Sequence, residues 1–143
     1  MLSKSQARTF FLGGTVVTFL VFIGLTIYSF MPQNDQTYHD KIDAKVIRGK
    51  ELWETNNCMG CHTILGEGGY YAPELTKVVE RRGEGYIKAV LQSPIPWGPK
   101  GRKMVKYEMN DADAEAMIAY FKWIGEIDLN GFDRVVSPLA KDE

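Results

Sequence analysis

The feature that most constrains this chain is an uncharged stretch near its N-terminus, which runs from Thr9 to Met31. As an α-helix, this stretch would extend roughly 35 Å, enough to cross the hydrocarbon core of a bilayer, which is about 30 Å thick. Backbone polar groups in that core need partners within the segment, and a helix provides them. The sequence therefore predicts a single N-terminal transmembrane helix over residues 9–31, preceded by a short segment of residues 1–8.

Charges on the two sides of the apolar stretch predict its orientation. Lys4 and Arg8 precede it, whereas Asp35 and Asp40 follow it. Because cytoplasmic flanks are enriched in Lys and Arg, we expect residues 1–8 in the cytoplasm and the rest of the chain outside. A cleaved signal peptide is the alternative interpretation. Its apolar region usually has about 7–15 residues and ends in small side chains, whereas this stretch is longer and ends in bulky ones.

The rest of the chain is expected to form one small all-α domain. Residues 32–45 are polar and charged and indicate a linker, and residues 46–143 would hold the domain and a C-terminal tail. Apolar residues at helical spacing, separated by Gly- and Pro-rich loops, predict four helices. Their approximate ranges are 46–57, 74–82, 84–92, and a last helix that begins near Asn110 or Asp111 and ends by Asp128.

Charge and cysteine content exclude two classes of protein. The chain has 17 basic and 18 acidic residues, and Lys4 and Arg8 precede the apolar stretch. The exported part is therefore acidic, which argues against a nucleic-acid partner. Because only two cysteines occur, a disulfide framework does not hold the domain together. A domain this small buries limited apolar area, and a covalently bound cofactor would compensate.

The two cysteines belong to a motif that predicts such a cofactor. Cys58, Cys61 and His62 form the pattern C-x-x-C-H, the attachment signature of c-type haem. Two thiols three residues apart on one helical turn can form thioethers with the two vinyl groups along one porphyrin edge. The imidazole of the next residue then reaches the iron. This attachment takes place outside the cytoplasm, which agrees with the expected orientation, and we expect one covalent haem c.

Other uses of the motif fit less well. A structural zinc site needs four ligands, and the only other histidine is His39 in the linker. A thioredoxin-like dithiol needs a βαβ context, which the sequence lacks.

The iron needs a second axial ligand, and a methionine would suit electron transfer. Met104 is favoured because it follows an irregular Pro- and Gly-rich segment, residues 94–101, that is free to cross the opposite haem face. Met109 is the second candidate, although it adjoins the last helix and is expected to pack under it. His39 is a weaker alternative. Three further methionines are less suitable by position: Met31, Met59 and Met117.

Basic residues surround Met104: Lys100, Arg102, Lys103 and Lys106. One interpretation is a solvated basic loop. The other is a positive rim near the haem edge that pairs with propionates or attracts an acidic redox donor. The sequence leaves both open.

Two segments flank the haem motif and carry a family resemblance. Residues 46–54 read VIRGKELWE, and residues 62–75 read HTILGEGGYYAPEL. The second segment resembles the H-T-L-L-G-E-G-A-Y-F-A-P-E-L of the cytochrome c subunit of bacterial nitric oxide reductase, with conservative changes at Ile64, Gly69 and Tyr71. The likeness covers nearly the whole chain, and this segment is much more specific than C-x-x-C-H itself.

The resemblance implies an architecture, a location and partners. It implies a class I cytochrome c domain carried by one transmembrane helix of the bacterial inner membrane, with the haem domain in the periplasm. The partner would be a large polytopic catalytic subunit that carries haem b, haem b3 and non-haem iron. Electrons would pass from a soluble cytochrome c or a cupredoxin through haem c to that subunit, which reduces two NO to N2O in denitrification. This chain alone would only transfer electrons.

The resemblance also bears on Met104. The family places its axial methionine in an Arg-x-Met-Pro-x-Phe setting, which Arg102 to Tyr107 match except that Val105 replaces the proline. The exchange leaves the choice of Met104 intact but is expected to loosen the loop. The stretch from Gly83 to Arg102 is also shorter than usual, so we expect the donor-docking surface to differ.

The glycine-rich segment after the motif acquires a role from the resemblance. In the family, similar loops face the catalytic subunit, and their backbone carbonyls contribute to a calcium ion near haem propionates. By position, Gly68 and Tyr70 would supply those carbonyls, which suit hard Ca²⁺. A haem-packing loop without metal is the alternative.

Two other functions stay open at this point. One is a free-standing, membrane-tethered cytochrome c shuttle that serves a terminal oxidase, and the other is a haem-based sensor with an open iron site. The loop from Gly66 to Leu75 favours the docked subunit, because a shuttle has no evident reason to carry it.

Overall fold

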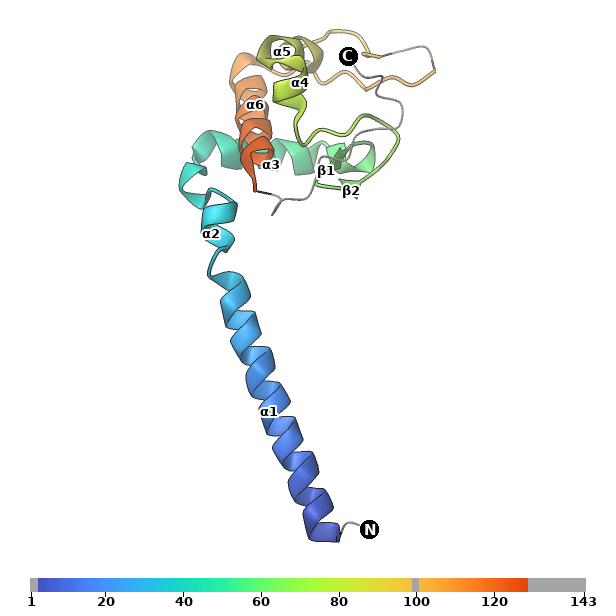
Figure 1. Ribbon diagram of the computed structural model, residues 1–143. Coiled ribbons are helices and arrows are strands. Elements are labelled where there is room, and N and C mark those ends of the chain that lie inside the picture. Colours follow the sequence, from blue (N-terminus) through green and yellow to red (C-terminus); the bar gives the residue numbers. More distant parts are fainter. Residues whose placement is uncertain (1–2, 99–100, 129–143) are drawn as a thin grey trace. The chain divides into compact units, whose positions relative to one another are not determined.

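The computed structural model describes residues 3–98 and 101–128 and divides into two units, Met1–Gln36 and Thr37–Glu143, shown in Figure 1. The first unit contains the helices α1 (Lys4–Phe30) and α2 (Gln33–Gln36). The second unit contains η1 (His39–Lys41), α3 (Ala44–Thr55), η2 (Cys58–Gly60), β1 (Thr63–Ile64), β2 (Glu67–Gly68), α4 (Val78–Arg82), α5 (Glu84–Leu91) and α6 (Asp111–Glu126). The expected C-terminal tail, residues 129–143, and Lys100 lie outside the described residues.

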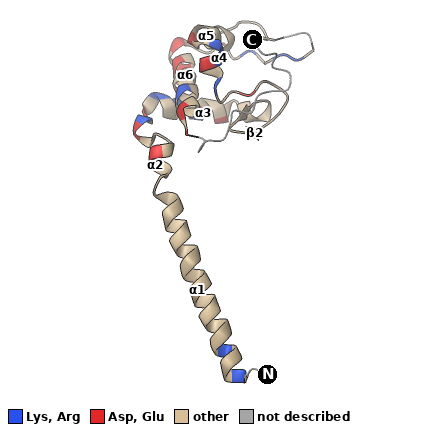
Figure 2. Ribbon diagram, viewed as in Figure 1, with Lys and Arg blue, Asp and Glu red and all other residues tan. Residues whose placement is uncertain are grey.

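The helix α1 has the properties of a membrane segment. Lys4–Gln36 is long and apolar enough to cross a membrane by length and composition, with a mean hydropathy of 2.3 over its most apolar window. None of the α1 side chains is buried. The only charges on α1 are at its N-terminal end, as Figure 2 shows. Hydroxyl groups within α1, such as that of Thr26, donate to the carbonyl one turn earlier, so their hydrogen bonds need no water.

The first turn of α1 is closed by a capping box. The Ser3 hydroxyl accepts a hydrogen bond from the Gln6 backbone N–H, and the Gln6 side chain accepts one from the Ser3 N–H. Two of the N–H groups that a helix start leaves without partners are thereby satisfied. This cap begins the helix five residues before the uncharged stretch, at Lys4 rather than at Thr9.

The core of the second unit forms where α3 meets α6 (Figure 1). Trp53 on α3 packs edge-on against Phe121 on α6, with ring centroids 5.8 Å apart. The two backbones approach closely at Gly49, where a Cβ atom would clash with the carbonyl oxygen of Ala116 and lie 2.6 Å from Cβ of Tyr120. The crossing of these helices therefore requires glycine at this position.

Both long helices of this unit begin at side-chain caps. Asp43 accepts a hydrogen bond from the Val46 N–H at 2.8 Å, and Asn110 accepts one from the Asp113 N–H at 2.8 Å. Each cap satisfies an N–H group at the start of its helix. Of the two caps expected for the last helix, the structure uses Asn110.

The expected all-α class is confirmed, because the described strands are one short hairpin. In it, Thr63 pairs with Gly68 and Ile64 with Glu67. The helix expected over residues 74–82 begins only at Val78. The residues before it are held in a loop, since the Leu75 N–H donates to the Thr63 carbonyl at 2.8 Å and the Thr76 hydroxyl accepts from the Leu65 N–H at 2.7 Å. These cross-chain bonds replace the first helical turn.

Candidate functional site

The motif Cys58–His62 lies on one tight turn at the end of α3. Asn57 has the left-handed backbone angles φ 50° and ψ 41°, which reverse the chain and start η2. The N–H groups of Cys61 and His62 both donate to the Cys58 carbonyl, at 3.1 and 2.9 Å. We call residues 57–62 the attachment turn. It holds the two cysteines and the histidine in the order that the sequence predicts.

The two thiols differ in their surroundings. Cys58 is 7% exposed, whereas Cys61 is exposed, and neither is in a disulfide. Burial, with a smaller contribution from the nearby Cys61, raises the pKa of Cys58 to about 11, and a hydrogen bond with the Tyr107 side chain opposes this rise. Cys58 is therefore a protonated thiol at neutral pH.

His62 is oriented by a backbone carbonyl. Its Nδ1 atom lies 2.7 Å from the carbonyl oxygen of Pro73. Because a carbonyl oxygen can only accept, Nδ1 carries the hydrogen and Nε2 keeps its lone pair. Burial lowers the pKa of His62, although the Pro73 hydrogen bond raises it in part, which favours the neutral ring. A neutral imidazole with a free Nε2 is the form that ligates a metal.

The segment that carries Pro73 is itself fixed against the attachment turn. We call residues 66–75 the glycine loop. The Ala72 N–H donates to the Cys61 carbonyl at 2.8 Å. Beyond Pro73, the Arg81 guanidinium donates to the Glu74 carbonyl and also lies 3.4 Å from its carboxylate. The carbonyl that orients His62 is therefore held from both sides.

Two glycines allow the glycine loop to lie directly on the attachment turn. At Gly68, where φ is +121°, a Cβ atom would clash with the carbonyl oxygen of His62. At Gly69, a Cβ atom would clash with the carbonyl oxygen of Gly60, and the Gly69 N–H donates to the Met59 carbonyl at 2.8 Å. The side chain of Tyr70 is 83% exposed. The loop thus presents two aromatic side chains to solvent, those of Tyr70 and of the 49% exposed Tyr71, and packs its backbone on the turn.

Met104 lies on a separate segment, whose described residues are 97–98 and 101–107; we call these residues the methionine strap. The Met104 N–H donates to the Trp97 carbonyl at 2.8 Å, and the Trp97 N–H donates to the Met104 carbonyl at 3.1 Å. The Met104 side chain is partly buried and packs against the core. Tyr107, three residues further, is hydrogen-bonded to the Cys58 thiol. The strap that carries Met104 therefore touches the attachment turn.

The other candidates for the second axial ligand, Met109 and His39, lie on other segments. Met109 also packs against the core, and its N–H donates to the Leu91 carbonyl at 3.1 Å, immediately before α6. His39 is exposed on η1, whose Lys41 pairs with Glu126 on α6 at 2.7 Å. These contacts agree with the packing role expected for Met109.

The donor set fits one covalently held haem. Two thiols on one turn, a neutral imidazole with a free Nε2 and a thioether on a strap that contacts the same turn are what a six-coordinate haem c requires. Cys58, Cys61, His62 and Met104 could hold it.

Comparison with known proteins gives the family. The Cytochrome c family model matches residues 46–125. The nitric oxide reductase C subunit of Stutzerimonas stutzeri is 41% identical over 133 residues, which cover 90% of this chain and 91% of that protein. The C subunits of the nitric oxide reductases of Halomonas halodenitrificans and Paracoccus denitrificans are 36% and 33% identical, and each match covers 89% of this chain and 91% of the relative. This chain belongs to the family of nitric oxide reductase C subunits. The resemblance seen in its sequence is confirmed.

The described basic residues around Met104, namely Arg102, Lys103 and Lys106, are all exposed but differ in their partners. The Arg102 guanidinium lies 5.5 Å from the centre of the Tyr71 ring and donates to the Tyr71 carbonyl at 3.4 Å, so it ties the methionine strap to the glycine loop. Lys103 is exposed, and Lys106 pairs with Glu108 at 3.4 Å. Arg102 thus differs from the two lysines, because its partner, Tyr71, lies on another loop.

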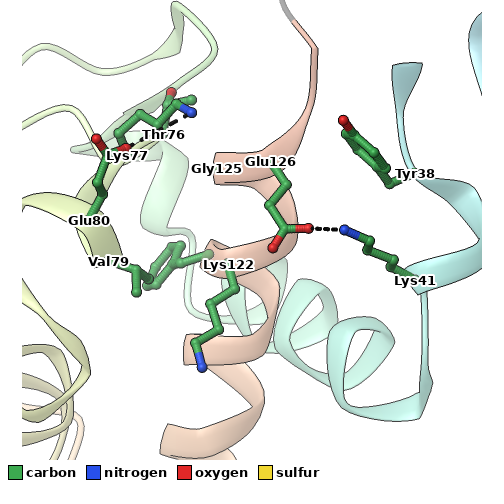
Figure 3. Close-up of a pocket in the computed structure, with 10 residues that line it drawn as sticks. Tyr38, Lys41, Thr76, Lys77, Val79, Glu80, Lys122, Gly125 and Glu126 are labelled. Carbon is green, nitrogen blue, oxygen red and sulfur yellow. Dashed lines mark hydrogen bonds and ion pairs between the residues drawn. The ribbon is translucent and has the colours of Figure 1, made fainter. Parts of the chain in front are cut away.

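A hollow of about 380 Å³ between η1, α4 and α6 is separate from this site (Figure 3). None of its lining residues belongs to the attachment turn or the methionine strap. The three lysines that line it are paired with carboxylates: Lys41 with Glu126 at 2.7 Å, Lys77 with Glu80 at 4.0 Å, and Lys122 with Glu84 at 2.6 Å. The hollow has no feature of a haem site or of an anion site.

Sequence reasoning missed the residues that position the candidate ligands. Pro73, near the end of the glycine loop, orients His62, Arg81 on α4 holds the neighbouring Glu74, and Trp97 pairs with Met104. A proline carbonyl eleven residues from the histidine gives no local signal. The only sequence hint for Trp97 is a large aromatic residue inside the segment 94–101, which otherwise consists of Gly, Pro, Ile95 and Lys100.

Proposed function

We propose that this chain is the electron-entry subunit of a membrane nitric oxide reductase. The observation that carries this proposal is the match to proteins named as nitric oxide reductase C subunits, over 90% of this chain and 91% of the relative. A cytochrome domain alone would be shared with electron carriers of many kinds. The chain is an electron-transfer subunit of an enzyme complex, and its cytochrome c domain implies haem c.

Cys58 and Cys61 hold the haem by thioethers in this proposal, and His62 and Met104 are the axial ligands. Bound haem supplies a one-electron couple at its iron. The Pro73 carbonyl fixes the tautomer and the orientation of His62. If His62 and Met104 both hold the iron, it would have no free position for a substrate, and this chain would transfer electrons and leave bond chemistry to its partner.

The chain is a membrane-anchored subunit, and the proposed topology places residues 1–8 in the cytoplasm. Residues 9–31 would cross the bacterial inner membrane, residues 32–45 would form the linker, and residues 46–143 would form the periplasmic domain. The basic N-terminal end of α1, visible in Figure 2, supports this orientation.

The proposed partner is a large polytopic catalytic subunit that carries haem b, haem b3 and non-haem iron. A soluble cytochrome c or a cupredoxin would reduce haem c, and the catalytic subunit would use these electrons to convert two NO to N2O, a step of denitrification. We also propose that the carbonyls of Gly68 and Tyr70 contribute to a calcium site at the interface with that subunit. The exposure of Tyr70 supports a loop that faces a partner.

Extraction of the full chain from native membranes in a mild detergent tests the proposed function. We expect a large polytopic haem protein to co-purify and the preparation to reduce NO when a donor supplies electrons. A Cys58→Ala/Cys61→Ala variant serves as the control, because it retains the anchor but loses covalent haem on a denaturing gel. A lone haem protein of 16.2 kDa would overturn the subunit assignment in favour of a shuttle. Rapid CO binding to the reduced haem c would favour a sensor.

A further inference from the structure

One aromatic pair, Tyr86 and Trp97, connects the methionine strap to α5. Trp97 and Met104 exchange two backbone hydrogen bonds, at 3.1 and 2.8 Å, so the position of one determines the position of the other. The indole of Trp97 packs edge-on against the Tyr86 ring with centroids 6.0 Å apart, and its Nε1–H donates to the Tyr86 hydroxyl at 3.3 Å. The strap is thus connected to Tyr86 by a ring contact and a hydrogen bond.

Tyr86 belongs to a well-anchored helix. It lies on α5, which buries Ile87 and Leu91 in the core. The guanidinium of Arg82, at the end of α4, lies 5.7 Å from the centre of the Tyr86 ring. Because α5 is packed into the core, the contacts with Tyr86 limit the movement of the methionine strap.

The described residues between Trp97 and Met104 include two glycines with positive φ angles. Gly98 and Gly101 have φ angles of +128° and +92°, and at Gly98 a Cβ atom would lie 2.8 Å from the Arg102 carbonyl oxygen. After Met104 comes Val105, which is 63% exposed, where the family resemblance leads one to expect a proline. A valine leaves φ free and so restricts the unfolded or detached strap less than a proline would.

We propose that Trp97 and Tyr86 are positioning residues that clamp the methionine strap and keep the Met104 sulfur on the haem iron. The inference rests on the proposed role of Met104 as axial ligand. Trp97 does not touch the iron in this proposal. It holds the backbone of Met104 by two hydrogen bonds and is itself held by Tyr86. The clamp performs the stiffening that the missing proline would otherwise contribute.

The expected size of the effect follows from the interactions that a variant at Trp97 removes. One hydrogen bond and one aromatic pair together should change the ratio of attached to detached methionine about tenfold, which corresponds to about 1.4 kcal/mol. Trp97 is 39% exposed, so its replacement does not open a cavity in the core.

The test compares Trp97→Leu and Tyr86→Phe with the wild-type holoprotein in detergent. The readouts are the far-red charge-transfer band of methionine-ligated ferric haem, the alkaline pH at which this band disappears, and CO binding to the reduced haem. We expect Trp97→Leu to lower the midpoint of the alkaline loss by about one pH unit, the equivalent of tenfold, and to accelerate CO binding. Ile95→Ala, at a neighbouring side chain that is 66% exposed, should leave all three unchanged.

A double-mutant comparison isolates the hydrogen bond. Trp97→Phe and Tyr86→Phe each remove one partner of the bond between Nε1–H and the hydroxyl but keep both rings. If the bond acts as proposed, the double variant should be no more sensitive to alkali than the worse single variant. Haem content on a denaturing gel confirms in each case that the variant has folded and bound haem.

Two outcomes separate the clamp from the ligand assignment. A far-red band that survives Met104→Ala would show that Met104 is not the ligand, which overturns the proposed site and the clamp with it. A band that is lost in Met104→Ala but has the wild-type alkaline midpoint in Trp97→Leu would overturn the clamp alone.

Discussion

At the residue scale, backbone atoms decide what the functional side chains can do. Nδ1 of His62 donates a hydrogen bond to the Pro73 carbonyl, so only Nε2 is available to a metal. The pKa of His62 is lowered by burial, and the ring is therefore neutral and ready to ligate at neutral pH. Gly68 and Gly69 act in the same way, because their missing side chains let the glycine loop press its backbone onto the attachment turn. None of these effects depends on a charged side chain.

A pair of alanine substitutions tests the close helix crossing. Gly49→Ala places a methyl group against the Ala116 carbonyl and Cβ of Tyr120, so α3 and α6 must move apart. Overpacking of this kind typically costs about 1–3 kcal/mol. We expect a loss of that size in the free energy of unfolding, measured by denaturant titration of the holoprotein with the haem absorbance as signal.

Gly85→Ala is the matched control for this substitution. Gly85 lies on α5, and a Cβ atom there would meet nothing within 4 Å. Alanine at such a helical position should stabilise by roughly 0.5–1 kcal/mol. Equal effects at Gly49 and Gly85 would contradict the proposed close approach of α3 and α6.

At the scale of elements, the start of α6 is fastened to α5 by a carboxylate. Asp111 lies 2.8 Å from the Lys88 ammonium and accepts a hydrogen bond from the Gln92 amide at 2.9 Å. The hydrogen bond from Lys88 is the main cause that lowers the pKa of Asp111, and that from Gln92 adds to it. Asp111 also occupies the first turn of α6, where negative charge is favourable.

Asp111→Asn should make the melting temperature depend less on pH in the acid range. Because the folded-state pKa of Asp111 lies below its ordinary value of 3.8, its contribution is complete above that value and disappears as pH falls through the lowered one. The variant should therefore melt at a lower temperature than wild type at neutral pH, and the difference should close below about pH 4. Thermal melts of the solubilised holoprotein at several pH values measure this. Glu67→Gln, at an exposed carboxylate on β2, is the control, and a difference that persists at low pH would rule out the ionic explanation.

Elements that depend on local pattern were predictable, and elements that depend on distant partners were not. The apolar helix, the attachment turn and the Asn110 cap each depend on residues that are adjacent in the sequence. The region before α4 was wrongly expected to be helical, because helix propensity there is overridden by hydrogen bonds to Thr63 and Leu65. The pairing of Trp97 with Tyr86 joins residues eleven positions apart on a loop and a helix, and no periodicity encodes it.

At the scale of the whole molecule, the charges around the methionine strap bear on donor choice. All three described basic residues are exposed, but Arg102 is engaged with Tyr71 on another loop, whereas Lys106 pairs with the exposed Glu108 two residues away. Long-range attraction by surface charges accelerates association and weakens as salt is added. Lys103 and Lys106 are therefore the better candidates for steering an acidic donor.

Charge reversal tests this steering. Lys103→Glu/Lys106→Glu should lower the association rate with a reduced soluble donor roughly tenfold at low ionic strength and flatten its salt dependence. Stopped-flow reduction of haem c at several ionic strengths measures both. Lys45→Glu/Lys50→Glu makes the same change in net charge on α3, where the lysines pair with Glu115 and Glu54. If both double variants slow the reaction equally, the effect belongs to net charge and the rim has no special role.

The first residues of the second unit, 37–41, are bound to its last helix, α6. The indole Nε1–H of Trp123 on α6 donates to the Thr37 carbonyl at 2.8 Å, and Lys41 pairs with Glu126 at 2.7 Å (Figure 3). The Lys41 ammonium also lies 4.5 Å from the centre of the Tyr38 ring. Residues 37–41 are thus fastened to the last helix of the second unit.

Trp123→Phe removes the hydrogen bond to Thr37 while it keeps an aromatic ring and leaves Lys41 in place for trypsin. If the bond fastens the linker, tryptic cleavage after Lys41 should accelerate up to about tenfold, since the cleavage rate follows the population of the open form and one hydrogen bond is worth about 1 kcal/mol. Lys122→Gln, on the same helix but paired with Glu84, should cleave at the wild-type rate. Time courses on gels of the detergent-solubilised holoprotein measure the cleavage. Equal rates in Trp123→Phe and wild type would mean that other contacts hold residues 37–41 and that Trp123 does not fix the tether.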